Sequence, residues 1–147
     1  MKTMNAKIKD VKVVMSRFGV TTSHTPQRVV SYVPMVTVTF DDPNMQKTDC
    51  MVGDLWGRFK KSDYLDRVLC QDFFVLVFKQ EWEIVSADGK LLHSMQPTGE
   101  IFQLTPEIRT DYFIVREGHT WVGYDKAGKV VASREMDAEE AAEYDNQ

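Results

Sequence analysis

The chain has 147 residues, of which 43% are hydrophobic and 27% are charged, and its formal net charge is −4. This length suits one domain with a sizeable core, and this composition excludes a chain that is disordered throughout. The modest negative charge argues against a strong binder of nucleic-acid backbones, because such proteins are usually basic. The charge is also uneven: bases outnumber acids up to Arg17, whereas six acids and no base follow from Glu135 onward.

The sequence gives no signal for a membrane or for export. The longest apolar run, Phe73 to Phe78, is far shorter than the roughly 18 residues that a membrane helix needs. Charged residues interrupt the N-terminal region, which therefore lacks the apolar core of a signal peptide. Cys50 and Cys70 show no repeated spacing and are expected to be reduced thiols. We expect a cytoplasmic protein without membrane association.

Two extended runs are predicted in the first third of the chain. In residues 7–17 the parity of the apolar positions changes after Ile8, which indicates either a β-bulge near Lys9 and Asp10 or a strand that starts later. The latter half of residues 28–40 alternates between apolar and polar positions, as a half-buried strand does. Pro34 lies within this run and lacks an N–H group, so the strand is expected to be broken there or to lie at a sheet edge.

Residues 44–61 show no clear period, and the segment after them predicts the one internal helix of the chain. Ser62 can cap a helix over residues 63–70, since its hydroxyl can accept a hydrogen bond from a free backbone N–H group. Spacings of one, three and four residues are typical of one helical face. That face would consist of Tyr64, Leu65, Val68 and Leu69.

The run from Phe73 to Phe78 is apolar at both parities, which predicts a strand that is covered on both faces. Beyond it, apolar and charged residues alternate. The same strand is therefore expected to continue, with Glu83 on a face turned to water. Asp88 and Gly89 favour the positive φ angles of a tight turn, so they predict a hairpin that returns over residues 90–95.

The last third of the chain predicts an antiparallel meander. Residues 100–104 indicate a short strand, and residues 105–107 could form a single helical turn. Three runs of β-branched and aromatic residues follow, separated by turns that contain glycine, which is the pattern of successive hairpins. These runs are residues 111–116, 120–125 and 130–134.

Together these patterns predict a mainly β domain over residues 1–134, an antiparallel meander closing into a small barrel or sandwich with one short helix. Residues 135–147 are expected to form an acidic C-terminal extension, either a solvated tail or a short helix. In the helical form Asp137 would be the N-cap, with Glu140 three residues later in a capping-box arrangement.

No motif in the sequence predicts a catalytic residue, a metal site or a cofactor. The histidines and cysteines are widely separated, whereas a structural zinc site normally shows two close pairs of ligands. Cys70 follows an apolar segment and is expected to be a small buried side chain. An enzyme would have to assemble its site from distant strands, with Cys50, His93 and His119 as candidate groups.

One segment interleaves aromatic and basic side chains, as proteins that bind single-stranded nucleic acid do. Its candidate binding residues are Trp56, Arg58, Phe59, Lys60 and Lys61. An OB-like barrel with an acidic tail would suit this activity, although the likeness to such binders is loose and no specific motif carries it. The alternative is that the apolar members of the segment pack inward while its bases face water.

The acidic extension offers a negative surface to a basic partner, with Tyr144 as an aromatic anchor. The candidate partner-binding residues are Glu135, Asp137, Glu139, Glu140, Glu143, Tyr144 and Asp145. We expect a non-enzymatic interaction protein that binds a macromolecule, in the first place a protein, through a sheet edge, exposed aromatics or this extension. Single-stranded nucleic acid is the alternative partner, and an enzyme is the second alternative. A homodimer through an open sheet edge is a further option.

Overall fold

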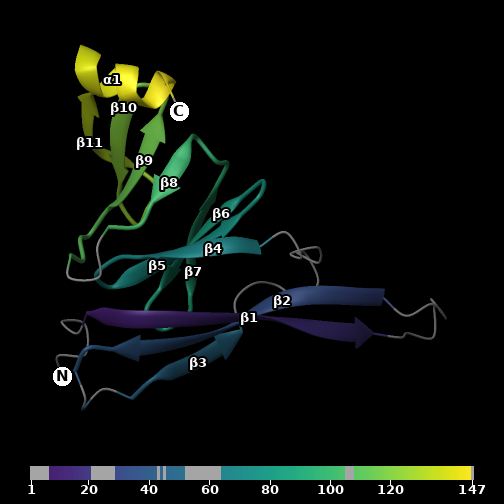
Figure 1. Ribbon diagram of the computed structural model, residues 1–147. Coiled ribbons are helices and arrows are strands. Elements are labelled where there is room, and N and C mark those ends of the chain that lie inside the picture. Colours follow the sequence, from purple (N-terminus) through teal and green to yellow (C-terminus); the bar gives the residue numbers. More distant parts are fainter. Residues whose placement is uncertain are drawn as a thin grey trace.

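A stack of three antiparallel sheets makes up the protein, with one short helix on the last sheet (Figure 1). The computed structural model describes residues 7–20, 29–42, 44, 46–51, 64–104 and 108–146. The predicted mainly β class with a short helix is confirmed. The sheets of the described chain do not close into a barrel, and one hydrophobic core lies on each side of the central sheet, so the sandwich alternative is the correct one, with a third layer added.

The N-terminal sheet has the order β1-β2-β3, and these strands are Ile8–Val20, Val29–Phe40 and Thr48–Met51. The predicted bulge is confirmed, because the register between β1 and β2 shifts between Ile8 and Asp10. The third strand was not predicted, because its short polar sequence has no alternation of apolar residues.

Pro34 marks the end of the pairing between β2 and β3. It lies opposite Met15 of β1, while β3 reaches only as far as Met35. A proline at this point removes no hydrogen bond to β3, because β3 has already ended. Among the described residues, β2 has β1 as its one neighbour at Pro34, whereas it is the middle strand along residues 35–38.

The central sheet has the order β4-β5-β6-β7, and these strands are Tyr64–Leu69, Phe73–Phe78, Trp82–Ser86 and Leu91–Met95. The helix predicted over residues 63–70 is therefore wrong. Leu65 lies at a bulge and is exposed, whereas Val68 and Leu69 are buried in different cores on opposite faces of the sheet. A strand that is covered on both faces at one end thus imitates the spacing of a helical face.

Strand β5 is buried along its whole length, as predicted. Its odd-numbered residues from Phe73 onward pack into the core shared with the C-terminal sheet, and its even-numbered residues from Phe74 onward pack into the core shared with the N-terminal sheet. Burial of each such side chain contributes about 1.5–3 kcal/mol. The central sheet therefore has a hydrophobic core on each side.

The expectation of one long strand past Phe78 is wrong. The chain turns after β5, and the Phe78 N–H group donates to the Glu81 carbonyl oxygen at 2.9 Å. Glu83 is 1% exposed, because it lies opposite Leu76 on the face that the N-terminal sheet covers. The next turn is the predicted hairpin between β6 and β7, in which Gly89 has a φ angle of +88°.

The C-terminal sheet confirms the predicted meander. Its order is β11-β10-β9-β8, and these strands are Val130–Glu135, Thr120–Tyr124, Phe113–Glu117 and Glu100–Phe102. Its inner face supplies aromatic side chains to the core. The Phe113 ring stacks on Tyr124 at 5.5 Å and meets Trp82 edge to face at 6.3 Å. The helical turn predicted over residues 105–107 lies outside the described residues. No helix in the described part is long and apolar enough to cross a membrane.

Candidate functional site: the outer face and the edge of the C-terminal sheet

The acidic C-terminal segment forms a helix, α1 (Ala138–Asp145), that begins at a side-chain cap. The Asp137 carboxylate accepts a hydrogen bond from the Glu140 N–H group at 2.8 Å, which confirms the predicted cap. Glu139 and Glu140 lie in the first turn, at the positive end of the helix dipole, where negative charge is favourable.

This helix lies across the outer face of the C-terminal sheet (Figure 1) and is attached to it by Glu140. The carboxylate of Glu140 accepts two hydrogen bonds from the Arg134 guanidinium, at 3.1 and 3.2 Å, and a third from Trp121 Nε1–H at 3.2 Å. The hydrogen bonds from Arg134 hold the pKa of Glu140 below its ordinary value, and the bond from Trp121 acts in the same direction.

The second attachment of α1 is the ring of Tyr144. Trp121 meets this ring edge to face at 5.9 Å, and the Arg116 guanidinium carbon lies 4.7 Å from its centroid, within cation–π distance. One residue further on, Asp145 Oδ1 lies 2.8 Å from Nε2 of His119 in the turn between β9 and β10.

Alternation along the strands explains why this face is aromatic and basic. Val115 and Val122 point into the core, so their neighbours Arg116 and Trp121, which pair across β9 and β10, point outward. Phe102 of β8 meets Trp121 edge to face at 5.3 Å. We call Phe102, Arg116, Trp121 and Arg134 the outer aromatic–basic face.

The expected contact residues of the acidic extension divide into two groups. Glu140, Tyr144 and Asp145 contact the sheet, and Asp137 caps the helix, so this part of the extension is docked and is not a solvated tail. Among the described residues, the exposed side chains of Glu135, Glu139 and Glu143 have no ion pair or hydrogen bond and remain available to a partner.

Strand β11 is the open edge of the same sheet. Of the strands β4 to β11, it is the one in which every residue is exposed, and Val130 and Val131 are 58% and 54% exposed. Met136 N–H donates to the His119 carbonyl oxygen at 2.8 Å, so even-numbered residues of this part of the strand bond to β10. By alternation, Ser133 and Glu135 direct their backbone N–H and C=O groups away from β10.

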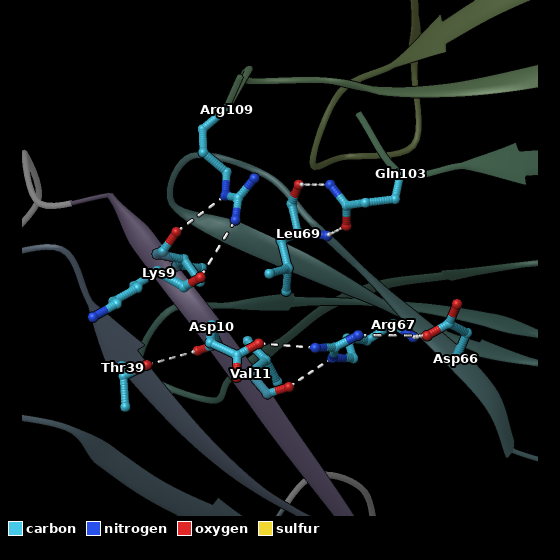
Figure 2. A network of polar contacts seen from close by, with 10 residues as sticks. Lys9, Asp10, Val11, Thr39, Asp66, Arg67, Leu69, Gln103 and Arg109 are labelled. Carbon is cyan, nitrogen blue, oxygen red and sulfur yellow. Dashed lines mark hydrogen bonds and ion pairs between the residues drawn. The ribbon is translucent and has the colours of Figure 1, made fainter. Parts of the chain in front are cut away.

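The facing edges of β1 and β4, by contrast, are covered by side chains (Figure 2). Arg67 Nε–H donates to the Val11 carbonyl oxygen at 2.7 Å. Arg109 donates to the Ile8 carbonyl at 3.1 Å and to the Lys9 carbonyl at 3.3 Å. Each guanidinium satisfies backbone acceptors that another strand would otherwise use, so these positions are closed to added strands.

Gln103 closes part of the β4 edge in the same manner (Figure 2). Its Oε1 accepts the Leu69 N–H group at 2.6 Å, and its Nε2 donates to the Leu69 carbonyl at 3.2 Å. The carbonyl oxygen and one N–H of a primary amide point to the same side, as the C=O and N–H groups of one strand residue do, and the second N–H of Gln103 donates to the Leu104 carbonyl at 3.0 Å. Gln103 therefore substitutes for one residue of a neighbouring strand.

The candidate catalytic groups whose side chains are described, Cys70, His93 and His119, are not brought together. Cys70 is buried, its thiol lies 3.5 Å from the Tyr112 carbonyl oxygen, and burial raises its pKa to about 12, so it is a poor nucleophile. His93 is in the central sheet and His119 is in a turn of the C-terminal sheet, where Asp145 is its partner. The Cys50 side chain lies outside the described part, and no described cluster of side chains could hold a metal ion.

The candidate nucleic-acid residues Trp56, Arg58, Phe59, Lys60 and Lys61 all lie outside the described residues, so the structure does not place them. No protein-family model matches the chain, and no curated protein matches it significantly in sequence. A function must therefore be inferred from the physical properties of the surfaces described above.

Sequence reasoning missed the outer aromatic–basic face, although a signal for it was present. Each strand of the terminal meander carries large side chains at both parities, as Trp121 beside Val122 and Tyr124 shows. Such a pattern indicates a sheet with something packed on both faces. The acidic helix that follows was the available candidate for the second cover.

Proposed function

We propose that the protein is a non-enzymatic interaction module that binds a protein partner by adding an extended segment of the partner to strand β11. The observation that supports this most directly is the exposure of all six residues of β11 at the open edge of a folded sheet. Unpaired N–H and C=O groups at a sheet edge are a template for another strand.

The backbone of Ser133 and Glu135 would supply the hydrogen bonds of the added strand. Each of these residues directs one N–H donor and one C=O acceptor away from β10. The two residues are two positions apart, as the outward-facing residues of a strand are when another strand pairs with them. Main-chain hydrogen bonds of this kind give affinity without specifying a sequence. The side chains beside the edge would supply the selectivity.

Val130 and Val131 would select for apolar side chains in the added strand. Both are more than half exposed, and they lie beside the bulge where the register of β10 and β11 shifts between Gly123 and Tyr124. At the other end of the strand, Glu135 is exposed and negative. The preferred ligand would thus be an extended segment with aliphatic side chains near Val131 and a base near Glu135.

A proline at position 133 tests the proposal sharply. Ser133→Pro removes the outward N–H group and no hydrogen bond to β10, so the fold should tolerate it. Ser133→Ala is the matched control, because it removes the hydroxyl and keeps the N–H group. Extended peptides selected from a displayed library on the wild-type protein should bind Ser133→Ala with nearly unchanged affinity and Ser133→Pro at least about tenfold more weakly.

The two variants also serve as paired baits in a quantitative pull-down from the source cell. A partner that uses the edge should be recovered with Ser133→Ala and lost with Ser133→Pro. Circular dichroism and thermal melting should confirm that both variants are folded. Equal recovery with two folded baits would show that the partner does not add a strand at β11 and would contradict the proposal.

A further inference from the structure

We infer that the outer aromatic–basic face is a second docking surface, which binds an acidic helix of a partner protein. The partner helix would carry an aromatic residue four positions after a carboxylate. In the free protein α1 occupies this face and competes with the partner helix for it. This surface is distinct from the β11 edge, since it uses side chains on one face of the sheet and none of the outward backbone groups. The inference therefore does not depend on the proposed function.

The contacts of α1 define the chemistry that the face recognises. Arg134 and Trp121 together place three donors around one carboxylate, that of Glu140. One helical turn later, the Trp121 indole and the Arg116 guanidinium both contact the ring of Tyr144. A helix with Glu-x-x-x-Tyr spacing presents these two groups on one side, because residues four apart lie one above the other.

Several properties of α1 make it displaceable. It has only eight residues, and an isolated helix of this length is unstable in water. None of its residues is fully buried, so little burial holds it in place. Its last turn has no basic residue, and Asp145 places a negative charge at the negative end of the dipole. The helix thus depends on its contacts with the sheet. Its short connection to β11 nevertheless keeps its effective concentration at the face high.

The arrangement of the rings favours a helix over a single-stranded nucleic acid. Bases bind by stacking flat on aromatic side chains. Here the two rings of the face, Phe102 and Trp121, meet at 67°, so they are not coplanar and do not form one flat stacking platform. Arg116 is also paired with Glu100 at 3.2 Å, which reduces the positive charge available to phosphates.

The test uses the full chain with α1 loosened and a labelled synthetic peptide of residues 135–147 as the probe. Glu140→Ala combined with Tyr144→Ala removes the two contacts of α1 with the outer aromatic–basic face and leaves that face intact, while the pair between Asp145 and His119 in the neighbouring turn remains. Asp137→Ala is a milder second variant, which removes only the helix cap. In fluorescence anisotropy, the loosened chain should bind the peptide at least about tenfold more tightly than the wild-type chain does, because the competitor no longer occupies the face.

Two controls locate the binding on the face. Arg134→Ala in the loosened chain should abolish binding of the peptide, and a peptide with alanine in place of Tyr144 should bind at least about tenfold more weakly. Equal binding by wild-type and loosened chains would overturn the inference. It would also be overturned by an oligonucleotide that binds the loosened chain more tightly than the peptide. A wild-type dimer that exchanges α1 between copies would overturn it as well, since the occupant would then be a second copy.

Discussion

The guanidinium of Arg67 in β4 donates its Nε–H group to the backbone carbonyl of Val11 in β1 at 2.7 Å. Its Nη2 atom donates to Oδ1 of Asp10 at 2.8 Å. Two edge strands of different sheets are thereby joined by one side chain and not by a ladder of backbone hydrogen bonds (Figure 2). This contact helps to hold the N-terminal sheet against the central sheet.

Arg67→Met should lower the free energy of unfolding by about 1–3 kcal/mol, because the partly buried Val11 carbonyl would lose its charged donor. Asp10→Asn should cost less than about 1 kcal/mol, since the Asp10 side chain is 55% exposed and a surface ion pair contributes little. Urea denaturation of both variants measures the difference. A larger loss for Asp10→Asn would show that the ion pair, and not the carbonyl contact, joins the two sheets.

Two glycines with similar backbone angles should respond differently to alanine. Gly118 has a φ of +63° with no atom within 4 Å of the position that an added Cβ would take, so Gly118→Ala should cost only about 1 kcal/mol of backbone strain. Gly128 has a φ of +78°, and an added Cβ would overlap the His93 ring. Gly128→Ala should therefore cost clearly more in thermal unfolding, and His93→Ala should recover the difference. Equal costs at the two positions would argue that His93 does not restrict Gly128.

Docking of α1 should depend on pH through Glu140. Its pKa is lowered in the folded protein by Arg134, so the stabilisation is fully present above the ordinary glutamate value of about 4.3 and is lost as the pH falls through the lower folded value. The protection of residues 138–145 against amide hydrogen exchange, measured relative to the intrinsic exchange rate at each pH, should accordingly fall in this acidic range. In Glu140→Gln, this protection should be lower at neutral pH and should change less with pH, which separates the effect of Glu140 from that of other carboxylates.

Cys70 should resist alkylation in the native protein. Its pKa is raised to about 12 because burial disfavours the thiolate, so very little thiolate forms at pH 8 to 9. Mass spectrometry of the peptide that contains Cys70 should show rapid modification by iodoacetamide in urea and almost none without it. Between the unfolded pKa near 9 and the folded value, rising pH should also lower stability, since the unfolded chain loses its proton first.

Local turn signals and apolar runs allowed most of the fold to be predicted. The Asp88-Gly89 hairpin, the terminal meander and the two-sided burial of β5 all depend on short stretches whose pattern has few alternatives. The helix predicted at residues 63–70 failed because Val68 and Leu69 are buried on opposite faces of a strand. Such a pattern cannot be distinguished from a helical face without knowing that a third sheet exists.

The candidate site could be predicted only in part, because it depends on contacts between distant residues. The cap at Asp137 is local, and sequence was sufficient to predict it. The attachment of Glu140 to Trp121 requires the register of β10 and β11, in which Trp121 lies opposite Arg134. Sequence alone gave the acidic character of α1 but not the basic and aromatic surface that receives it.

The double-sided burial of β5 has a consequence for synthesis of the chain. A ribosome releases the N-terminal sheet and the central sheet before the C-terminal sheet has been synthesised. The core between the first two sheets can therefore form while the other face of the central sheet is still uncovered. During that interval Phe73, Trp82 and Ile84 would face solvent as one apolar surface. Such surfaces promote aggregation of nascent chains and attract chaperones. Slow translation between residues 95 and 113 would prolong this exposed stage, whereas rapid translation would shorten it.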